Sequence, residues 1–151
     1  MLVRMLPSHV ADKWEVYKPM IVWALPPPIR YSPGVETNVL AAILRGDLAV
    51  WGAYWPNEPT GKLMAIFTTI EQYEPISGSR SLFIYTLYGT MPLTNRELWQ
   101  DSIAQLLRHA EARGCYSVST YTCDRGTISM IERLGGNTEY RLAEINLDTD
   151  G

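Results

Sequence analysis

The chain has 151 residues, of which 46% are hydrophobic and 19% are charged, so it can bury a core as one domain. Its net charge of −3, without a Lys/Arg cluster, argues against a nucleic-acid-binding face. No apolar run is long enough for a membrane span, and the N-terminus lacks the basic and apolar leader of a signal peptide. We therefore expect one domain over residues 1–151, with no nucleic-acid partner, membrane span or secretion signal.

The cysteines and histidines argue against a disulfide and a metal site. Cys115 and Cys123 flank a predicted strand, whose length separates their Cα atoms by about 26 Å. A disulfide needs roughly 4.4–6.8 Å between Cα atoms. His9 and His109 are the only imidazoles, and no paired Cys or His spacing occurs, so we expect free thiols and no metal.

The first half of the chain predicts two helices and an unusual proline-rich segment. Ser8 and Thr37 are the expected helix caps, Pro19 is expected to kink or end the first helix, and Gly46 to end the second. The expected elements, in chain order, are a strand over 2–6, a helix from Pro7, an irregular segment over 20–34, a helix from Thr37 to Gly46, a strand over 48–55, a hairpin loop over 56–61 and a strand over 63–70.

The segment from Trp23 to Tyr31 is the candidate partner-binding surface. Pro26, Pro27 and Pro28 favour polyproline II, which exposes its backbone, and an aromatic residue stands at each end of the segment. Two interpretations stay open here: an arm that contacts a partner or a substrate, or a rigid connector whose aromatic rings pack on the domain.

The second half is organised around a strand, a loop and a helix over 82–114. The uncharged strand LFIYTLY is expected to be central, and a capping box at Thr94 to Glu97 is expected to open the helix, which Gly114 ends. The inward face of this helix is predicted to carry Trp99, Ile103, Leu106, Leu107 and Ala110. The remaining expected elements are a polar turn over 71–80, a strand over 116–121, a helix capped by Asp124 that ends at Gly135 and Gly136, and a strand over 139–147.

This element order resembles the GNAT superfamily of acyl-CoA-dependent N-acetyltransferases. The segment LLRHAEARGC resembles the end of that family's central helix, and ISMIERLGG resembles its C-terminal signature. The resemblance implies an α/β (α+β) fold, with a mixed, mostly antiparallel sheet of six or seven strands and helices on both faces.

The family's pyrophosphate loop is degenerate here. Its glycine-bearing stretch falls on Asn95, Glu97 and Trp99, and Gly89 is the only glycine between Arg80 and Gly114. Glycine lets phosphates approach bare backbone, whereas Trp99 would fill that space and Glu97 would repel an anion. We therefore expect no cofactor, unless the chain is an enzyme, in which case acetyl-CoA is implied.

The family's catalytic tyrosine is also replaced, because its position falls on Ile131, which cannot transfer a proton. If the chain is an N-acyltransferase, Tyr88 and Tyr121 are the candidate acids, with Tyr85 as a further one. Glu71 is the candidate base, with Glu74 as a further one. The alternative for each is a packed aromatic ring or a solvated carboxylate.

A closer resemblance is to small GNAT-like proteins of tailed bacteriophages, encoded among virion-morphogenesis genes. It lies in Tyr-Ser-Pro, in NVLAAILRGDLAVW and in the spacing up to RLGG. This resemblance implies a non-catalytic virion or assembly protein that binds other virion proteins, in the virion or the host cytoplasm. The alternatives are a divergent acetyl-CoA-dependent N-acetyltransferase and a module that binds a small ligand in the former cofactor cleft.

Overall fold

The computed structural model describes residues 1–55, 61–89, 96–122, 124–140, 143–145 and 147. By internal contacts the chain forms two units, Met1–Thr120 and Tyr121–Gly151. The elements, in chain order, are β1 (Leu2–Arg4), α1 (Pro7–Asp12), α2 (Trp14–Trp23), α3 (Pro27–Arg30), α4 (Val35–Arg45), β2 (Ala49–Tyr54), β3 (Leu63–Glu74), β4 (Ser79–Gly89), α5 (Arg96–Ala112), β5 (Ser117–Thr120) and α6 (Arg125–Arg133).

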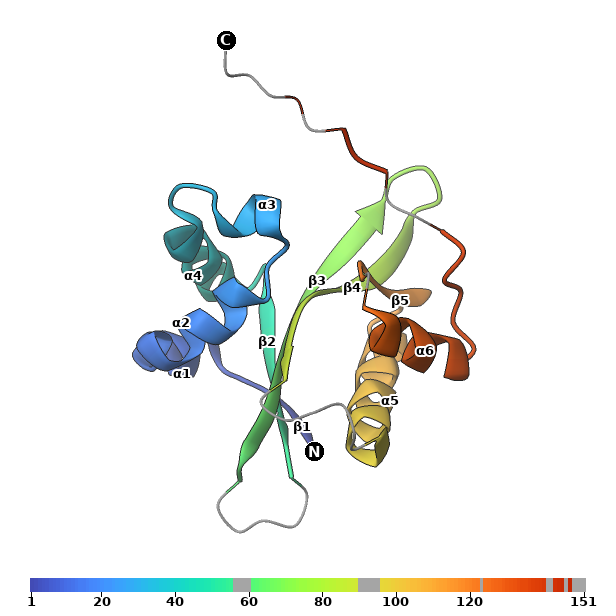
Figure 1. Ribbon diagram of the computed structural model, residues 1–151, viewed down its shortest axis with the longest axis horizontal. Coiled ribbons are helices and arrows are strands. Elements are labelled where there is room, and N and C mark those ends of the chain that lie inside the picture. Colours follow the sequence, from blue (N-terminus) through green and yellow to red (C-terminus); the bar gives the residue numbers. More distant parts are fainter. Residues whose placement is uncertain (56–60, 90–95, 123, 141–142, 146, 148–151) are drawn as a thin grey trace. The chain divides into compact units, whose positions relative to one another are not determined.

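Among the described residues, the first unit is built on a five-stranded sheet with the strand order β1-β2-β3-β4-β5, which is fewer than the six or seven strands expected (Figure 1). The first four strands pair antiparallel and β5 joins β4 in parallel, so the mixed, mostly antiparallel sheet is confirmed. The expected central strand lies within β4, between β3 and β5. The predicted strand over 139–147 is not found, because no described residue of this segment is in a strand.

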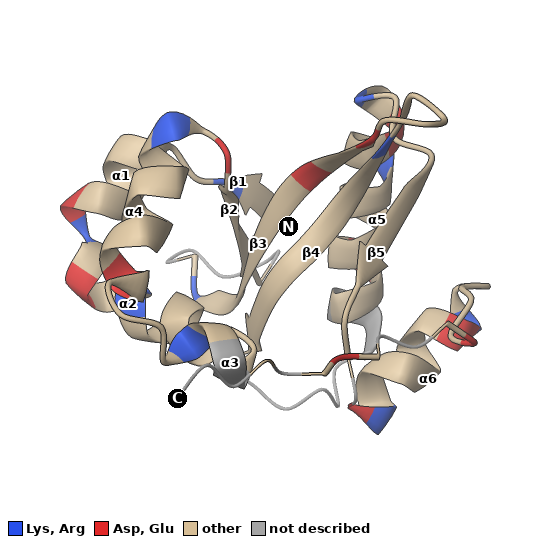
Figure 2. Ribbon diagram, turned by 90° about the horizontal axis from the view of Figure 1, so that it is seen from above, with Lys and Arg blue, Asp and Glu red and all other residues tan. Residues whose placement is uncertain are grey.

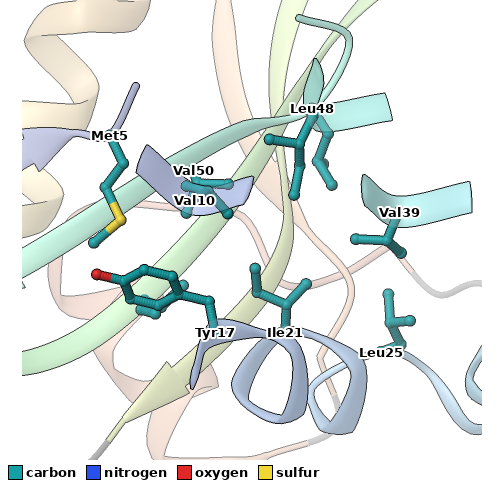
Figure 3. Close-up of a cluster of buried hydrophobic side chains, with 10 residues drawn as sticks. Met5, Val10, Tyr17, Ile21, Leu25, Val39, Leu48 and Val50 are labelled. Atoms are coloured by element: carbon teal, nitrogen blue, oxygen red, sulfur yellow. The ribbon is translucent and has the colours of Figure 1, made fainter. Parts of the chain in front are cut away.

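Helices cover both faces of this sheet, as expected (Figure 1). Side chains of α1, α2, α4, β2 and β3 form one apolar cluster on the first face, part of which Figure 3 shows converging. On the second face, Trp99 of α5 meets Phe67 of β3 edge-on at 5.9 Å between ring centroids. Figure 2 shows Lys, Arg, Asp and Glu mainly on helices and turns, with few along the strands. Apolar burial on both faces therefore holds the sheet.

Three predictions for the first half are wrong in detail. Pro19 does not end its helix: it lies inside α2, which continues to Trp23, because the buried Ile21 (0% exposed) continues the apolar face beyond the proline. Leu6 and Gly34, rather than Ser8 and Thr37, precede the first turns of α1 and α4. The triple proline does not form polyproline II, since Pro27 and Pro28 open α3, where proline at the first helical positions is favourable.

The central helix α5 largely follows its predicted face. Trp99, Leu106 and Ala110 are buried and Gly114 takes a left-handed φ of 76° after the helix, but Leu107 is 43% exposed. Leu107 directly follows the buried Leu106 and lies outside the helix face that Trp99, Leu106 and Ala110 share. The predicted capping box falls on residues 94–97, of which 94 and 95 lie outside the described residues, as does the hairpin loop over 56–60.

The second unit contains α6. The Asp124 carboxylate accepts a hydrogen bond from the Thr127 backbone N–H at 2.8 Å, so the predicted cap is confirmed. Gly135 takes the left-handed φ of 81° directly after the helix, as its sequence position indicates.

Candidate functional site

The parallel pairing between β4 and β5 ends halfway along β4. The Ile84 carbonyl accepts a hydrogen bond from the Thr120 hydroxyl at 3.0 Å, and Ile84 with Thr120 is the last pair between β4 and β5. β4 continues for five more residues, Tyr85 to Gly89, of which Thr86 to Gly89 stay paired with β3 on the other edge. Within the part of the chain that the structure describes, no strand pairs with this second edge of 85–89. Such an edge offers backbone N–H and C=O groups to an extended ligand.

A β-bulge stands where this opening begins. Ile84 pairs with Thr69 and Thr86 with Thr68, so Tyr85 is an extra residue in β4. Tyr85 packs against the apolar cluster under α2 and α4, and the Thr86 hydroxyl shares a buried hydrogen bond with the Thr68 hydroxyl. The bulge therefore turns two consecutive side chains toward the same face of the sheet.

Tyr88 occupies this opening and shares a row of the sheet with a glycine. Tyr88 pairs with Ile66, which pairs with Gly52 on its other side, so Tyr88 and Gly52 lie about 10 Å apart across two strand spacings. A Cβ on Gly52 would lie 2.6 Å from Met5 Cε and 2.8 Å from Tyr54 Cε2. The missing side chain of Gly52 thus makes room for the Tyr54 ring above the same row.

Further hydroxyl groups extend this face toward α1 and α2. The Tyr17 hydroxyl lies 3.2 Å from His9 Nε2, within hydrogen-bonding distance. Burial, reinforced by the nearby Tyr17, raises the pKa of the Tyr54 hydroxyl, and burial likewise raises the pKa of Tyr85. Both hydroxyls are therefore protonated at neutral pH and are suited to donate a proton or a hydrogen bond.

The structure does not bring the predicted acid and base together. Glu71 pairs with Leu82, six residues along β4 from Tyr88, which is about 20 Å of strand. Its carboxylate accepts hydrogen bonds from Arg113 Nε at 2.7 Å and Nη2 at 3.1 Å, on the α5 face. These bonds hold the pKa of Glu71 below its usual range. Tyr121, 62% exposed, follows β5 and belongs to the second unit.

The alternative base, Glu74, has a structural role at the turn between β3 and β4. Its carboxylate accepts hydrogen bonds from the backbone N–H groups of Ile76 at 3.0 Å and Ser77 at 2.6 Å. Hydrogen bonds from Ser77 are the main cause that lowers the pKa of Glu74. This carboxylate orders the turn at the end of β4 remote from Tyr88.

The residues at the expected pyrophosphate loop are only partly described. Asn95 lies outside the described residues, and for Glu97 only the backbone is described, in the first turn of α5. Trp99 is 5% exposed and its ring packs on Phe67, so its side chain belongs to the core beneath α5.

The proline-rich segment carries an exposed aromatic pair around an arginine. The Arg30 guanidinium carbon lies 5.3 Å from the Trp23 ring centroid and 5.8 Å from that of Tyr31, and Nη2 donates to the Leu25 carbonyl at 3.1 Å. Trp23 is 61% and Tyr31 72% exposed, while Pro26 is half-buried. The rings are thus held in place but not packed into the core; partner binding through them stays a prediction.

Neither a metal-binding cluster nor a membrane-spanning helix is found among the described residues. They contain no group of three His, Cys, Asp or Glu side chains placed to hold a metal ion. Among them, too, no helix combines the length and apolar character needed to cross a membrane.

Sequence reasoning missed Gly52, Tyr54, Tyr17 and His9 as parts of this face. No local sequence signal marks these four residues as parts of one face. Their proximity depends on the register between β2 and β3 and on how α1 and α2 pack against the sheet. Neither can be read from a single sequence.

Together, the β4–β5 opening, the bulge and the strand order define a GNAT-like fold. In line with this, the chain is similar over its whole length to solved acetyltransferase structures. A structure described as a probable acetyltransferase has a TM-score of 0.71 and 10% identity, with 100% of this chain and 99% of that chain covered. The ribosomal-protein-alanine N-acetyltransferase of Brucella melitensis has a TM-score of 0.68 and 12% identity, covering 97% and 99%. AAC(6')-Iy, in complex with a bisubstrate analogue, CoA-S-monomethyl-acetylneamine, has a TM-score of 0.68 and 18% identity, covering 98% and 97%.

These similarities show the fold. No protein-family model matches the chain, and no curated protein matches it in sequence. The expectation of a non-catalytic virion or assembly protein is nevertheless contradicted, because these similar structures are acetyltransferases and nothing in them points to a phage particle. The enzymatic alternative is the better supported one.

Proposed function

We propose that the protein is a divergent acetyl-CoA-dependent N-acetyltransferase. The observation that carries this proposal is the edge of β4 over 85–89, which begins at a bulge, follows the end of the parallel pairing with β5 and has no partner strand among the described residues. The edge accounts for binding without a glycine-rich loop, since the pantetheine arm of the cofactor carries amide groups that can pair with a strand edge. The similarity to AAC(6')-Iy in complex with a CoA-containing bisubstrate analogue supports the same assignment.

When bound, acetyl-CoA supplies an acyl group activated as a thioester. We assign to Tyr88, 37% exposed at the open edge, the proton donor to the departing sulfur. An amine that took the acyl group would lose one proton through the face that carries Tyr17 and His9, while the thiol would leave with the proton of Tyr88, which would then be replaced from solvent. On that face the hydrogen-bonded Tyr17 and His9 can pass the amine's proton to solvent.

Binding is tested first, by titration calorimetry and by amide hydrogen exchange with acetyl-CoA. We expect a micromolar dissociation constant and slower exchange of the amides of 85–89, while those of 81–84, already paired on both edges, change little. Absence of binding at millimolar acetyl-CoA overturns the proposal.

Catalysis is tested by thiol release with a panel of amines: an aminoglycoside, glucosamine 6-phosphate and a peptide with an N-terminal alanine. Tyr88→Phe is expected to lower kcat by roughly 100-fold with little change in acetyl-CoA affinity, because only the proton donor is removed. Tyr73→Phe is the matched control, since Tyr73 is an exposed tyrosine at the other end of the same ribbon and pairs with Arg80. Binding without thiol release from any amine would instead indicate a ligand-binding module.

A further inference from the structure

A second hollow lies on the other face of the sheet, at the closed end of β4. It has a volume of about 500 Å³ and is lined by the polar side chains of Arg4, Asp47, Thr69, Glu71, His109 and Arg113. Its volume is within the range of small-molecule sites. The hollow adjoins Leu82, in the part of β4 that pairs with β5, and the tyrosines of the proposed active site are on the opposite face. It is therefore a separate site.

Arg4 is the cation of this hollow that lacks an anionic partner among the described residues. Arg113 is engaged by Glu71 through two hydrogen bonds, and Asp47 is paired with Arg45 at 2.9 Å. The Arg4 guanidinium carbon lies 5.9 Å from the centroid of the Trp51 ring and makes no ion pair with a described residue. A planar guanidinium is well matched to the two oxygens of a carboxylate or phosphate.

The charges around the hollow favour an anion. The lining itself carries two guanidinium groups, Arg4 and Arg113, and two carboxylates. Outside the lining, Arg45 and Arg80 pair with these carboxylates at 2.9 Å and 4.0 Å, so the neighbourhood has a charge of +2 in a chain of net charge −3. A small anion would therefore be drawn to this part of an otherwise acidic protein.

His109 is placed to respond to such an anion. Its ring meets the Trp51 ring edge-on at 4.7 Å between centroids, so Arg4 and His109 both lie next to the Trp51 ring. Burial chiefly, with the cations Arg4 and Arg113, holds the pKa of His109 below its ordinary value, and Glu71 opposes them in part. An oxyanion beside Arg4 would offset these cations and favour the imidazolium form.

We propose that this hollow binds a small oxyanion, a carboxylate or a phosphate, between the Arg4 guanidinium and the His109 imidazole. This binding is independent of acetyl transfer. It is expected to raise the pKa of His109, because the protonated imidazole contributes a second positive charge to the site.

The chain offers an internal reference for the test, because His9 and His109 are its only histidines. Each ring is followed by NMR through a pH titration, with assignment by His9→Gln, in chloride, acetate or inorganic phosphate at matched ionic strength. We expect saturating acetate or phosphate to raise the pKa of His109 by about one pH unit, equivalent to tenfold tighter binding to the protonated ring, and to leave His9 where it is in chloride. A response to phosphate alone assigns a phosphoryl ligand; a response to acetate assigns a carboxylate.

Arg4→Gln removes the proposed anchor at an exposed position of an edge strand, and it is expected to abolish the anion-dependent shift of His109. Arg108→Gln is the matched control, because Arg108 is an exposed neighbour of His109 in sequence and does not line the hollow. Equal shifts of both histidines, no shift of His109, or an unchanged shift in Arg4→Gln would each overturn the proposal. Thermal melting of each variant establishes that the fold is retained.

Discussion

The two halves of β4 differ in what they do, although one uncharged run, Leu82 to Tyr88, extends across both. From Ser79 to Ile84 the strand pairs with β3 on one edge and is joined by β5 on the other from Ser81 onward, and Glu71 ties the neighbouring strand to α5. From Tyr85 to Gly89 the strand keeps only its β3 partner among the described residues. The closed half is built for stability and the open half leaves backbone groups for a ligand.

The bulge separates these two halves. Without the bulge, the side chains of β4 would alternate through its whole length, and Tyr85 and Thr86 would face opposite sides of the sheet. One additional residue thus supplies both a local bend and a hydroxyl-rich face beside the free edge.

The largest expected effect breaks the closed half. Leu82→Ala should lower the free energy of unfolding by about 2–5 kcal/mol, because Leu82 is 2% exposed between β3 and β5 and its loss leaves a cavity. Leu87→Ala, at a half-buried position of the open half, is the matched variant and should cost clearly less. Urea denaturation measures both. Equal losses would mean that the two halves contribute alike to stability.

The next effect tests the hydroxyl pair beside the bulge. Thr68→Val or Thr86→Val alone should cost about 1–3 kcal/mol, because each leaves the partner hydroxyl buried without its hydrogen bond. The double variant, which removes both hydroxyls at nearly constant volume, should be within about 1 kcal/mol of the wild type. Additive losses in this double-mutant cycle would show that the two hydroxyls are not coupled.

The parts of this comparison that sequence could predict are the local ones. Gly46 and Gly114 end helices with left-handed backbone, and Asp124 caps α6, because each signal acts within a few residues. The uncharged character of 82–88 correctly indicated a strand inside the sheet, although only its first residues, 82–84, have a neighbouring strand on both edges, and the element order indicated the GNAT-like fold.

The parts that sequence missed depend on register and docking. Alternation over 139–147 predicted a strand, yet a strand exists only with a partner edge, and Tyr140 and Ile145 are each 88% exposed. The role of Gly52 depends on its position beneath Tyr54 after β2 pairs with β3. Glu71 was predicted as a candidate base or else a solvated carboxylate, and its ion pair was missed because its partner Arg113 is 42 residues away.

A smaller effect concerns this same Glu71, which braces the closed half. Because its pKa is lower in the folded state than in the unfolded chain, it stabilises the fold at pH values above the unfolded pKa of about 4.5. This contribution is lost as the pH falls through the folded pKa. Glu71→Gln should therefore be less stable than the wild type at pH 7, and the gap should narrow below pH 4.5 and in 1 M salt.

Urea denaturation between pH 3 and pH 7 measures this gap. Glu111→Gln serves as the control, since Glu111 is an exposed carboxylate on the last turn of α5, the helix that Arg113 directly follows. A gap that is independent of both pH and salt would show that the ion pair contributes nothing and that packing alone explains the loss.

The smallest effect comes from His109, at the same closed half. The pKa of His109 is lower in the folded state than the unfolded value of 6.5, because burial and the neighbouring Arg4 and Arg113 disfavour the imidazolium. Above pH 6.5 both states hold a neutral ring, so stability does not depend on this group. As the pH falls below 6.5 the unfolded chain takes up the proton first, and stability declines until the folded pKa is passed. His109→Gln should remove this decline, whereas His9→Gln should leave it, and urea midpoints from pH 5 to pH 8 measure the difference.

If phosphate occupies the hollow, the decline should also shrink in wild-type protein, because the anion brings the folded pKa of His109 back toward 6.5. A decline that persists in His109→Gln would assign it to another group and remove His109 from the account of this half of the sheet.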